Sequence, residues 1–184
     1  QEATYLKQMR HLPVAIAAVL ALEPQIIAWA EEFARKENAL FLGRGIHYPI
    51  ALEGALKLKE IAYIHAEGFA AGELKHGPIA LIDHGQPVFV LLPSPRESTL
   101  LHSKIVSNIQ DIRARGARVI VIAEEGDAAV LPYADEVLRV PLTGPMFEPL
   151  LAVVPLQIFA MALATAKGLD VDQPRNLAKS VTVE

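Results

Sequence analysis

Three charged residues, Glu53, Lys57 and Glu60, recur at helical spacing within one short stretch of this chain. At positions i, i+4 and i+7 of a helix, they share a narrow sector of one face. One interpretation is a solvated face with an ordinary Glu–Lys pair, which contributes roughly 0.2–0.5 kcal/mol. The other is a carboxylate base beside an ammonium that keeps it ionised and steadies a developing oxyanion, as proton abstraction next to a carbonyl requires. The spacing alone leaves both interpretations open.

Two histidines follow in a connector that also contains acidic residues. His65-x-Glu67 and Glu73-x-x-His76 look like metal-ligand spacings, but neither has an obvious third ligand and the chain has no cysteine. We therefore expect no metal and no cofactor. His76 suits a general acid or base near neutral pH, for example in opening a sugar ring. A lone histidine of this kind is nevertheless more often a hydrogen-bonded structural residue.

The segment Gly43-Arg44-Gly45 follows a short apolar run and invites a dinucleotide-binding interpretation. The third glycine of that fingerprint is absent, because position 48 is Tyr, and no acidic ribose partner is evident. No P-loop pattern exists in the chain either. We predict a tight turn at which the backbone must pass closely.

Bulk composition restricts the protein class. The 184 residues are 52% hydrophobic and 21% charged, which is typical of one folded domain with a full core. A net charge of −4 gives no electrostatic reason to expect nucleic acid or an anionic membrane as partner. The absence of cysteine excludes disulfides and fits a reducing compartment such as the cytoplasm. The chain starts with Gln1 rather than Met, so we expect it to begin partway through a longer polypeptide.

Four short, apolar and β-branched runs, bounded by Pro or Gly, are typical of buried parallel strands. They lie at 39–42, 88–92, 118–123 and 137–140. Helical patterns alternate with them. The expected helices cover 4–9, 12–22, a segment restarted by Pro24, 49–62, 98–115, 128–133 and a final helix that stops at Gly168.

This alternation predicts an α/β fold, a three-layer α/β/α sandwich with a mainly parallel sheet. Ligands in such sheets bind outside the carboxyl ends of the strands, and the segment after 39–42 is one such end. The longest apolar stretch, 150–166, is interrupted by Pro155 and Gln157 and is shorter than a bilayer requires, so we expect a soluble protein. The polar residues 170–184 are expected to form a surface tail.

Two specific motifs carry a family resemblance. ALEGALKLKEIAYIHAEGFAAGELKHGP, together with DQPRNLAKSVTVE near the C-terminus, resembles the second sugar-isomerase (SIS) subdomain of the glutamine:fructose-6-phosphate amidotransferase family. The resemblance covers effectively the whole chain, 1–184. It implies a single SIS-type, flavodoxin-like domain in which residues 170–184 form an active-site tail.

The resemblance also implies roles for the helical charges. The glutamate of KLKE, here Glu60, is the base that moves a proton between C1 and C2 of the open-chain sugar and binds the substrate. Lys57 assists at the sugar hydroxyls as a catalytic residue. Glu53 lies behind it as a substrate-binding relay partner.

The end motifs add residues from elsewhere in the chain. The resemblance implies that His76, of LKHGP, assists ring opening in the site of the neighbouring subunit of a homodimer. It implies that Lys179, of NLAKS, forms a Schiff base with the ketose carbonyl and that Ala178 contributes backbone contact to the sugar. Without the resemblance, a lysine in a polar tail would be interpreted as solvated.

The activity implied is the isomerase part of an enzyme that makes glucosamine 6-phosphate from fructose 6-phosphate and glutamine-derived ammonia. Its glutaminase domain needs a cysteine nucleophile and its first SIS subdomain brings a Ser/Thr-rich phosphate loop, and neither is found here. Ser94, Ser98 and Thr99 are more typical of a helix N-cap region. We therefore expect a fragment whose partners are those two domains of the same polypeptide. Two alternatives stay open: a non-catalytic phosphosugar-binding SIS module, and a free-standing sugar-phosphate isomerase with its own phosphate loop.

Overall fold

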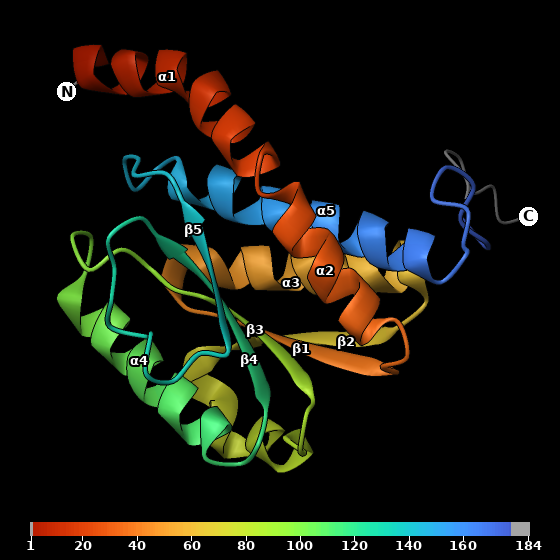
Figure 1. Ribbon diagram of the computed structural model, residues 1–184. Helices are drawn as coiled ribbons and strands as arrows, with labels where there is room; N and C mark the ends of the chain where they lie inside the picture. The colour runs from red at the N-terminus through yellow and green to blue at the C-terminus, as the bar shows by residue number, and fades with distance from the viewer. Residues whose placement is uncertain (1, 178–184) are drawn as a thin grey trace, which may run out of the picture.

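The computed structural model describes residues 2–177. Five parallel strands form one sheet in the order β2-β1-β3-β4-β5 (Figure 1). The strands are β1 (Asn38–Gly43), β2 (His65–Ala70), β3 (Pro87–Leu91), β4 (Arg118–Glu124) and β5 (Glu136–Val140). This order is that of the flavodoxin-like doubly wound fold, in which strand order reverses between β1 and β3.

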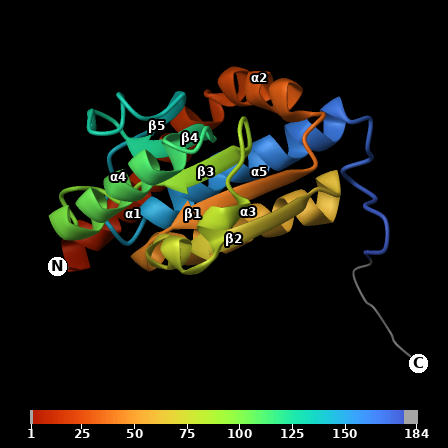
Figure 2. The ribbon, with the colours of Figure 1, turned by 90° about the horizontal axis from the view of Figure 1, so that it is seen from below.

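Helices cover both faces of this sheet, so the predicted three-layer α/β/α architecture is confirmed (Figures 1 and 2). The helices are α1 (Glu2–Leu20), α2 (Glu23–Phe33), α3 (Tyr48–Lys57), α4 (Thr99–Arg113) and α5 (Glu148–Ala166). α3 and α5 lie on one face with α2 packed on α5, whereas α4 covers the other face. Two short 3-10 segments, η3 (Ala71–His76) and η4 (Pro78–Leu81), extend the α4 layer.

The core is continuous on both sides of the sheet. Aromatic rings dominate the face under α2, α3 and α5, where Phe89 stacks on Phe41 at 4.9 Å between centroids and meets Phe159 at 4.6 Å. The face under α4 is aliphatic, with Val90 and Ile109 fully buried. Because each central strand is buried on both faces, its sequence is apolar throughout rather than alternating.

Strand β2 corrects the expectation that residues 65–70 are a connector. It pairs with β1 along its whole length, from Asn38↔His65 to Gly43↔Ala70. As an edge strand it is only half-buried, so its His, Glu and Gly residues hide the usual strand pattern. Gly68 is needed because α3 crosses directly over it: a Cβ there would lie 2.9 Å from the backbone of Leu52.

Two expected helices differ from the structure. The predicted break between 4–9 and 12–22 is absent, because α1 runs continuously through Pro13. Pro13 is solvent-exposed there, so water can satisfy the carbonyl that loses its donor. The predicted helix at 128–133 is only a series of turns, held by bonds such as Tyr133 N–H to the carbonyl of Val130. Pro24, by contrast, starts α2 as predicted.

Helix α5 is the most apolar of the described α-helices. It runs through Pro155 as the single long final helix that was predicted, and by length and composition it could cross a membrane, with a mean hydropathy of 1.9. Half of its most apolar window is buried inside the domain, where it packs on α2 and α3. Its apolar surface is therefore used in the core.

Candidate functional site

Three charged side chains, two on α3 and one on the turn that follows it, meet at one ammonium. Lys57 Nζ donates a hydrogen bond to Glu60 Oε2 at 2.5 Å and lies 3.4 Å from Glu53 Oε1. The hydrogen bond to Glu60 and the charges of both carboxylates raise the pKa of Lys57. The side chains are 28–36% exposed, so they lie at a partly covered surface rather than on a fully solvated face. The ammonium therefore stays protonated and is held between two acceptors.

A π-helical turn, η2 (Leu58–Ala62), follows α3 and carries Glu60. The carbonyl of Leu58 accepts the N–H of Tyr63, five residues on, and Tyr63 then adopts a left-handed conformation with φ 55°. The sequence predicted only that a helix reaches about Ala62. Single π turns are rare and occur frequently at functional sites, and periodicity could not indicate this one.

The site lies at the amino ends of the strands, opposite to the carboxyl ends at which ligand binding was expected. β1 ends at Gly43 and α3 returns antiparallel to it, so Lys57 and Glu60 lie near the residues at which β1 and β2 begin. Figure 1 shows the end of α3 and the segment after α5 at that same end of the strands. The expectation that the site follows the carboxyl end of 39–42 is therefore wrong for these residues.

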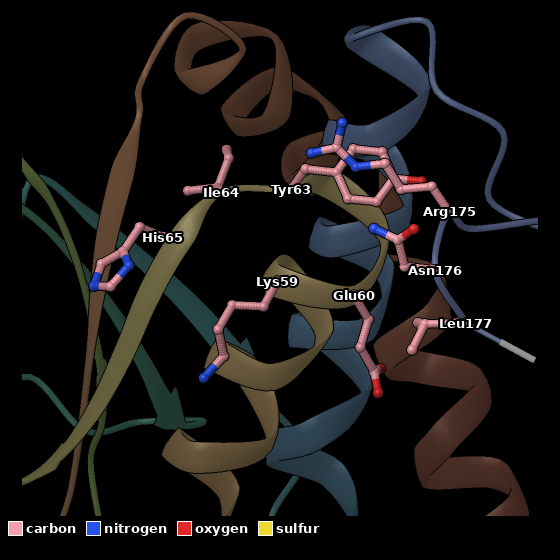
Figure 3. Close-up of a pocket in the computed structure, with 8 residues that line it drawn as sticks. All are labelled: Lys59, Glu60, Tyr63, Ile64, His65, Arg175, Asn176 and Leu177. Carbon is pink, nitrogen blue, oxygen red and sulfur yellow. The ribbon is translucent and has the colours of Figure 1, made fainter. Parts of the chain in front are cut away.

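A cavity of about 460 Å³ opens beside Glu60. Figure 3 shows Lys59 and Glu60 on one side of the hollow and the stacked pair Tyr63 and Arg175 on the other. Leu177, from the chain after α5, completes the wall. Two segments more than a hundred residues apart thus line an open cavity beside the predicted base.

The two candidate residues near the C-terminus, Ala178 and Lys179, follow the wall residue Leu177 in the sequence. Ala178 and Lys179 lie outside the described residues, so their predicted contacts with the sugar remain predictions. Leu177 precedes them directly.

His76 is not brought to Glu60. It ends η3, beyond the carboxyl end of β2, whereas Glu60 lies before the start of β2, and the strand between them is about 17 Å long. His76 Nδ1 is hydrogen-bonded to Glu73 Oε2 at 2.8 Å, and its side chain is 71% exposed. Its predicted service in another subunit's site is compatible with this exposure and remains a prediction.

The metal-like spacings are local hydrogen-bonded pairs. His65 Nε2 lies 3.1 Å from Glu67 Oε1. Within residues 2–177, no three His, Asp or Glu side chains are grouped so as to hold a metal ion.

The glycine turn and the serine cluster have structural roles. A Cβ on Gly43 would lie 2.2 Å from the carbonyl oxygen of His47, so the predicted close backbone approach is confirmed. Gly45 has φ +58°, which favours glycine. Ser98 caps α4 by accepting the N–H of Leu101, in agreement with the predicted N-cap region.

The crevice where strand order reverses holds a pair of residues that the sequence analysis missed. His47 follows β1, Glu148 begins α5, and His47 Nε2 lies 3.8 Å from Glu148 Oε2. The cavity they line is only about 20 Å³, room for about one water molecule. Glu97 and Glu124 add negative charge nearby. A position directly after a strand end was the available signal, and the crevice as built does not accommodate a sugar phosphate.

Burial shifts both groups toward their neutral forms. Desolvation, followed by repulsion from Glu97 and Glu124, raises the pKa of Glu148 to about 7. Desolvation lowers the pKa of His47 to about 4. The folded state thus binds more protons than the unfolded state at Glu148 between pH 4.5 and 7, and fewer at His47 between pH 4 and 6.5. Glu148 makes stability fall with rising pH in its window, and His47 makes it rise.

The free energy of unfolding of Glu148→Gln, relative to that of the unmodified protein, should therefore increase as pH rises from 4.5 to 7. The total increase over this window should be about 3 kcal/mol. The advantage should then level off, since Glu148 is ionised in both states above that window. Urea unfolding at several pH values measures it. Glu125→Gln, in an exposed turn, is the matched control and should show no such trend. A difference for Glu148→Gln that does not vary with pH would contradict the assigned burial cost.

Comparison with known families identifies the fold. The profile of the SIS domain family matches residues 32–166, which include all five strands. The chain belongs to the SIS domain family. The family resemblance carried by the KLKE and LKHGP motifs is thereby confirmed, and α1 together with most of α2 precedes the matched region.

Curated relatives of this SIS domain are named glutamine–fructose-6-phosphate aminotransferase (isomerizing). The protein from Leifsonia xyli subsp. xyli is 69% identical over 184 residues, which are 100% of this chain and 30% of that protein. The protein from Corynebacterium glutamicum is 62% identical over 182 residues, 99% of this chain and 29% of that protein. The chain thus spans about 30% of the length of the curated relatives it matches.

Solved structures agree with the fold. The C-terminal domain of glucosamine-fructose-6-phosphate aminotransferase from Francisella tularensis superposes with a TM-score of 0.85 at 39% identity, covering 94% of this chain and 48% of that chain. A tagatose-6-phosphate ketose/aldose isomerase homologue from Clostridium novyi NT gives 0.81 at 19% identity, covering 97% and 48%. The second similarity concerns the fold alone.

Proposed function

We propose that this SIS domain is the isomerase half-site of an amidotransferase that converts fructose 6-phosphate and ammonia into glucosamine 6-phosphate. The observation that carries the proposal is the Lys57 ammonium held between Glu53 and Glu60, beside a cavity walled by the chain that leads to Lys179. The names of the close relatives support the substrate. Residues 1–184 would form one domain, with 170–184 as its active-site tail.

The chemistry follows from the residue types. The neutral amine of Lys179 attacks C2 of the open-chain ketose, a C=N bond forms and water leaves. Ammonia displaces the lysine, and the resulting imine draws electrons from C1. Glu60 removes the C1 proton while the imine nitrogen gains a proton and becomes an amine. Glu60 then returns its proton to C2, and the C1 hydroxyl gives up its own proton as it becomes the aldehyde carbonyl. Lys57 stabilises the oxygen that gains charge, and Glu53 fixes the ammonium.

Part of the site is supplied from outside the chain. The crevice at the strand reversal is too small and too acidic for a sugar phosphate, which supports a phosphate site in another domain. Leu52 and Leu56 are 42% and 40% exposed beside the charged triad, as expected of a surface that another domain covers. We assign these roles to a first SIS subdomain, and the ammonia supply to a glutaminase domain of the same polypeptide.

A homodimer completes the proposal. His76 is exposed and lies about one strand length from Glu60, which supports a role in a neighbouring copy's site rather than in its own. We also propose a cytoplasmic location, because a cysteine-dependent glutaminase works in a reducing compartment.

A phosphosugar-binding module without catalysis is the second candidate function. The exposed local pair of His76 with Glu73 favours it, because such a pair needs no reaction to explain it. The triad on α3 argues against it, since a sensor has no use for a base together with a Schiff-base lysine. A free-standing isomerase would need a phosphate loop, and none is identified in this sequence.

Calorimetry and turnover with fructose 6-phosphate test the division of the site. Residues 1–184 alone should bind the sugar phosphate weakly or not at all and should form no glucosamine 6-phosphate, because the phosphate contacts are missing. The full-length protein should do both with ammonium as the nitrogen source. Tight binding by residues 1–184 would contradict a phosphate site outside the chain, and binding without turnover in the full-length protein would favour the sensor.

A further inference from the structure

We propose that Tyr63 and Arg175 form a clamp that positions the C-terminal tail so that Lys179 is delivered to Glu60. The inference rests on the proposed function, because it concerns how that site is assembled. Neither residue is among those to which the sequence motifs assign a role.

The first support is the pair of contacts between the two residues, 112 positions apart in sequence. The hydroxyl of Tyr63 accepts the backbone N–H of Arg175 at 2.7 Å. The guanidinium carbon of Arg175 lies 4.1 Å from the centroid of the Tyr63 ring, which is a cation–π distance. Figure 3 shows the guanidinium stacked on the ring. Two different interactions thus hold one point of the tail.

The second support is the backbone on the Glu60 side. Tyr63 is three residues after Glu60 and closes the π turn that carries it. Its φ of 55° places a bulky side chain in a sparsely populated conformation. Such strain persists only where surrounding structure maintains it, and it concentrates at functional sites. Here the strained residue is the one that binds the tail.

The third support is the course of the tail after the clamp. The side chain of Asp170 accepts the N–H groups of Asp172 and Gln173, which organises the turn that follows α5. Asn176, directly after Arg175, has φ 62°, in the left-handed region. Leu177 comes next and lies in the wall of the cavity that Glu60 also lines. Lys179 follows two residues later.

The clamp fixes the position of Arg175 in the tail relative to the turn that carries Glu60. Misplacing a reacting group by about 1 Å can cost a factor of roughly 100 in rate, so a contact that sets where the tail leaves the domain affects the chemical step. Tyr63 and Arg175 are positioning residues, since neither needs to touch the sugar.

The test uses the full-length protein with fructose 6-phosphate and ammonium. Tyr63→Phe keeps the ring and removes the hydroxyl acceptor, whereas Arg175→Ala keeps the backbone N–H and removes the stacked cation. Each should lower kcat roughly 10-fold to 100-fold and slow borohydride trapping of the Schiff base, with affinity for the sugar phosphate unchanged. Arg175→Lys should restore part of the rate. The double variant should be less impaired than the product of the two single effects, because both act through one clamp.

Hydrogen exchange supplies a readout besides activity. The amide of Arg175 should exchange faster in Tyr63→Phe, while Tyr133→Phe, a control on a different turn, should change neither exchange at Arg175 nor kcat. Faster exchange with wild-type kcat and trapping would overturn the proposal, because the contact would then be surface packing only. Unchanged exchange would also overturn it.

Lys179→Ala, measured in parallel, separates this inference from the proposed function. Loss of turnover in Lys179→Ala with wild-type turnover in Tyr63→Phe overturns the clamp alone. Wild-type turnover in Lys179→Ala overturns the Schiff-base role itself and, with it, the purpose of the clamp.

Discussion

Replacing Glu60 with glutamine in the full-length protein is expected to abolish exchange of the C1 proton of fructose 6-phosphate with solvent and to lower turnover by about 10³-fold. Glutamine is nearly isosteric and its carbonyl oxygen can still accept the hydrogen bond from Lys57, so the π turn and the ammonium should stay in place. What disappears is the proton-accepting carboxylate. Binding of the sugar phosphate should be largely retained.

The measurement is deuterium wash-in at C1 and C2, followed by nuclear magnetic resonance, alongside the rate of glucosamine 6-phosphate formation. Glu37→Gln is a matched control, because Glu37 is an exposed glutamate outside the cavity. It should leave both quantities within about twofold of the unmodified protein. Exchange that persists at the wild-type rate in Glu60→Gln would remove Glu60 from the mechanism and favour a non-catalytic role for the triad.

Replacing Lys179 with alanine is expected to eliminate the covalent adduct that borohydride traps with fructose 6-phosphate. Reduction of the C=N bond would fix the sugar on the lysine nitrogen, so mass spectrometry of tail peptides can locate it. Two lysines of the described residues lie near Glu60: Lys57 is held by two carboxylates, and Lys59 is exposed at the wall of the cavity.

The control for this experiment is Lys167→Ala, which removes an exposed lysine just after α5. It should leave trapping unchanged. Labelling that persists in Lys179→Ala would show that the Schiff-base assignment is wrong. The unfolding temperature of Lys179→Ala, measured alongside, should match that of the unmodified protein, so that a loss of trapping can be attributed to chemistry.

The grouping of the three charged side chains at the end of α3 was predictable because it depends on local spacing. Glu53, Lys57 and Glu60 fall on one face for any helical chain, and the structure indeed brings them to one ammonium. Spacing could not show whether that face is solvated or partly covered. It also could not show the π turn, since the extra residue per turn depends on how the end of α3 is held against its neighbours.

The edge strand illustrates a different limit. Central strands such as β3 are buried on both faces and carry an unmistakable apolar run. β2 gains its strand conformation from pairing with β1 and from the passage of α3 over Gly68, so its own sequence resembles a connector. At 128–133 the error was the reverse: the sequence is compatible with a helix, but the structure holds these residues only in turns.

By itself, the sequence determined the α/β class, the alternation of helices and buried strands, and the family. Strands buried on both faces appear as short apolar runs, and the family motifs are contiguous stretches, so both can be identified from neighbouring residues. Tertiary structure alone decided that the charged face of α3 lies at the amino edge of the sheet, that His47 and Glu148 fill the strand-reversal crevice, and that Tyr63 meets Arg175. These facts join residues far apart in the chain. Their distances follow from how the layers pack, which no local pattern specifies.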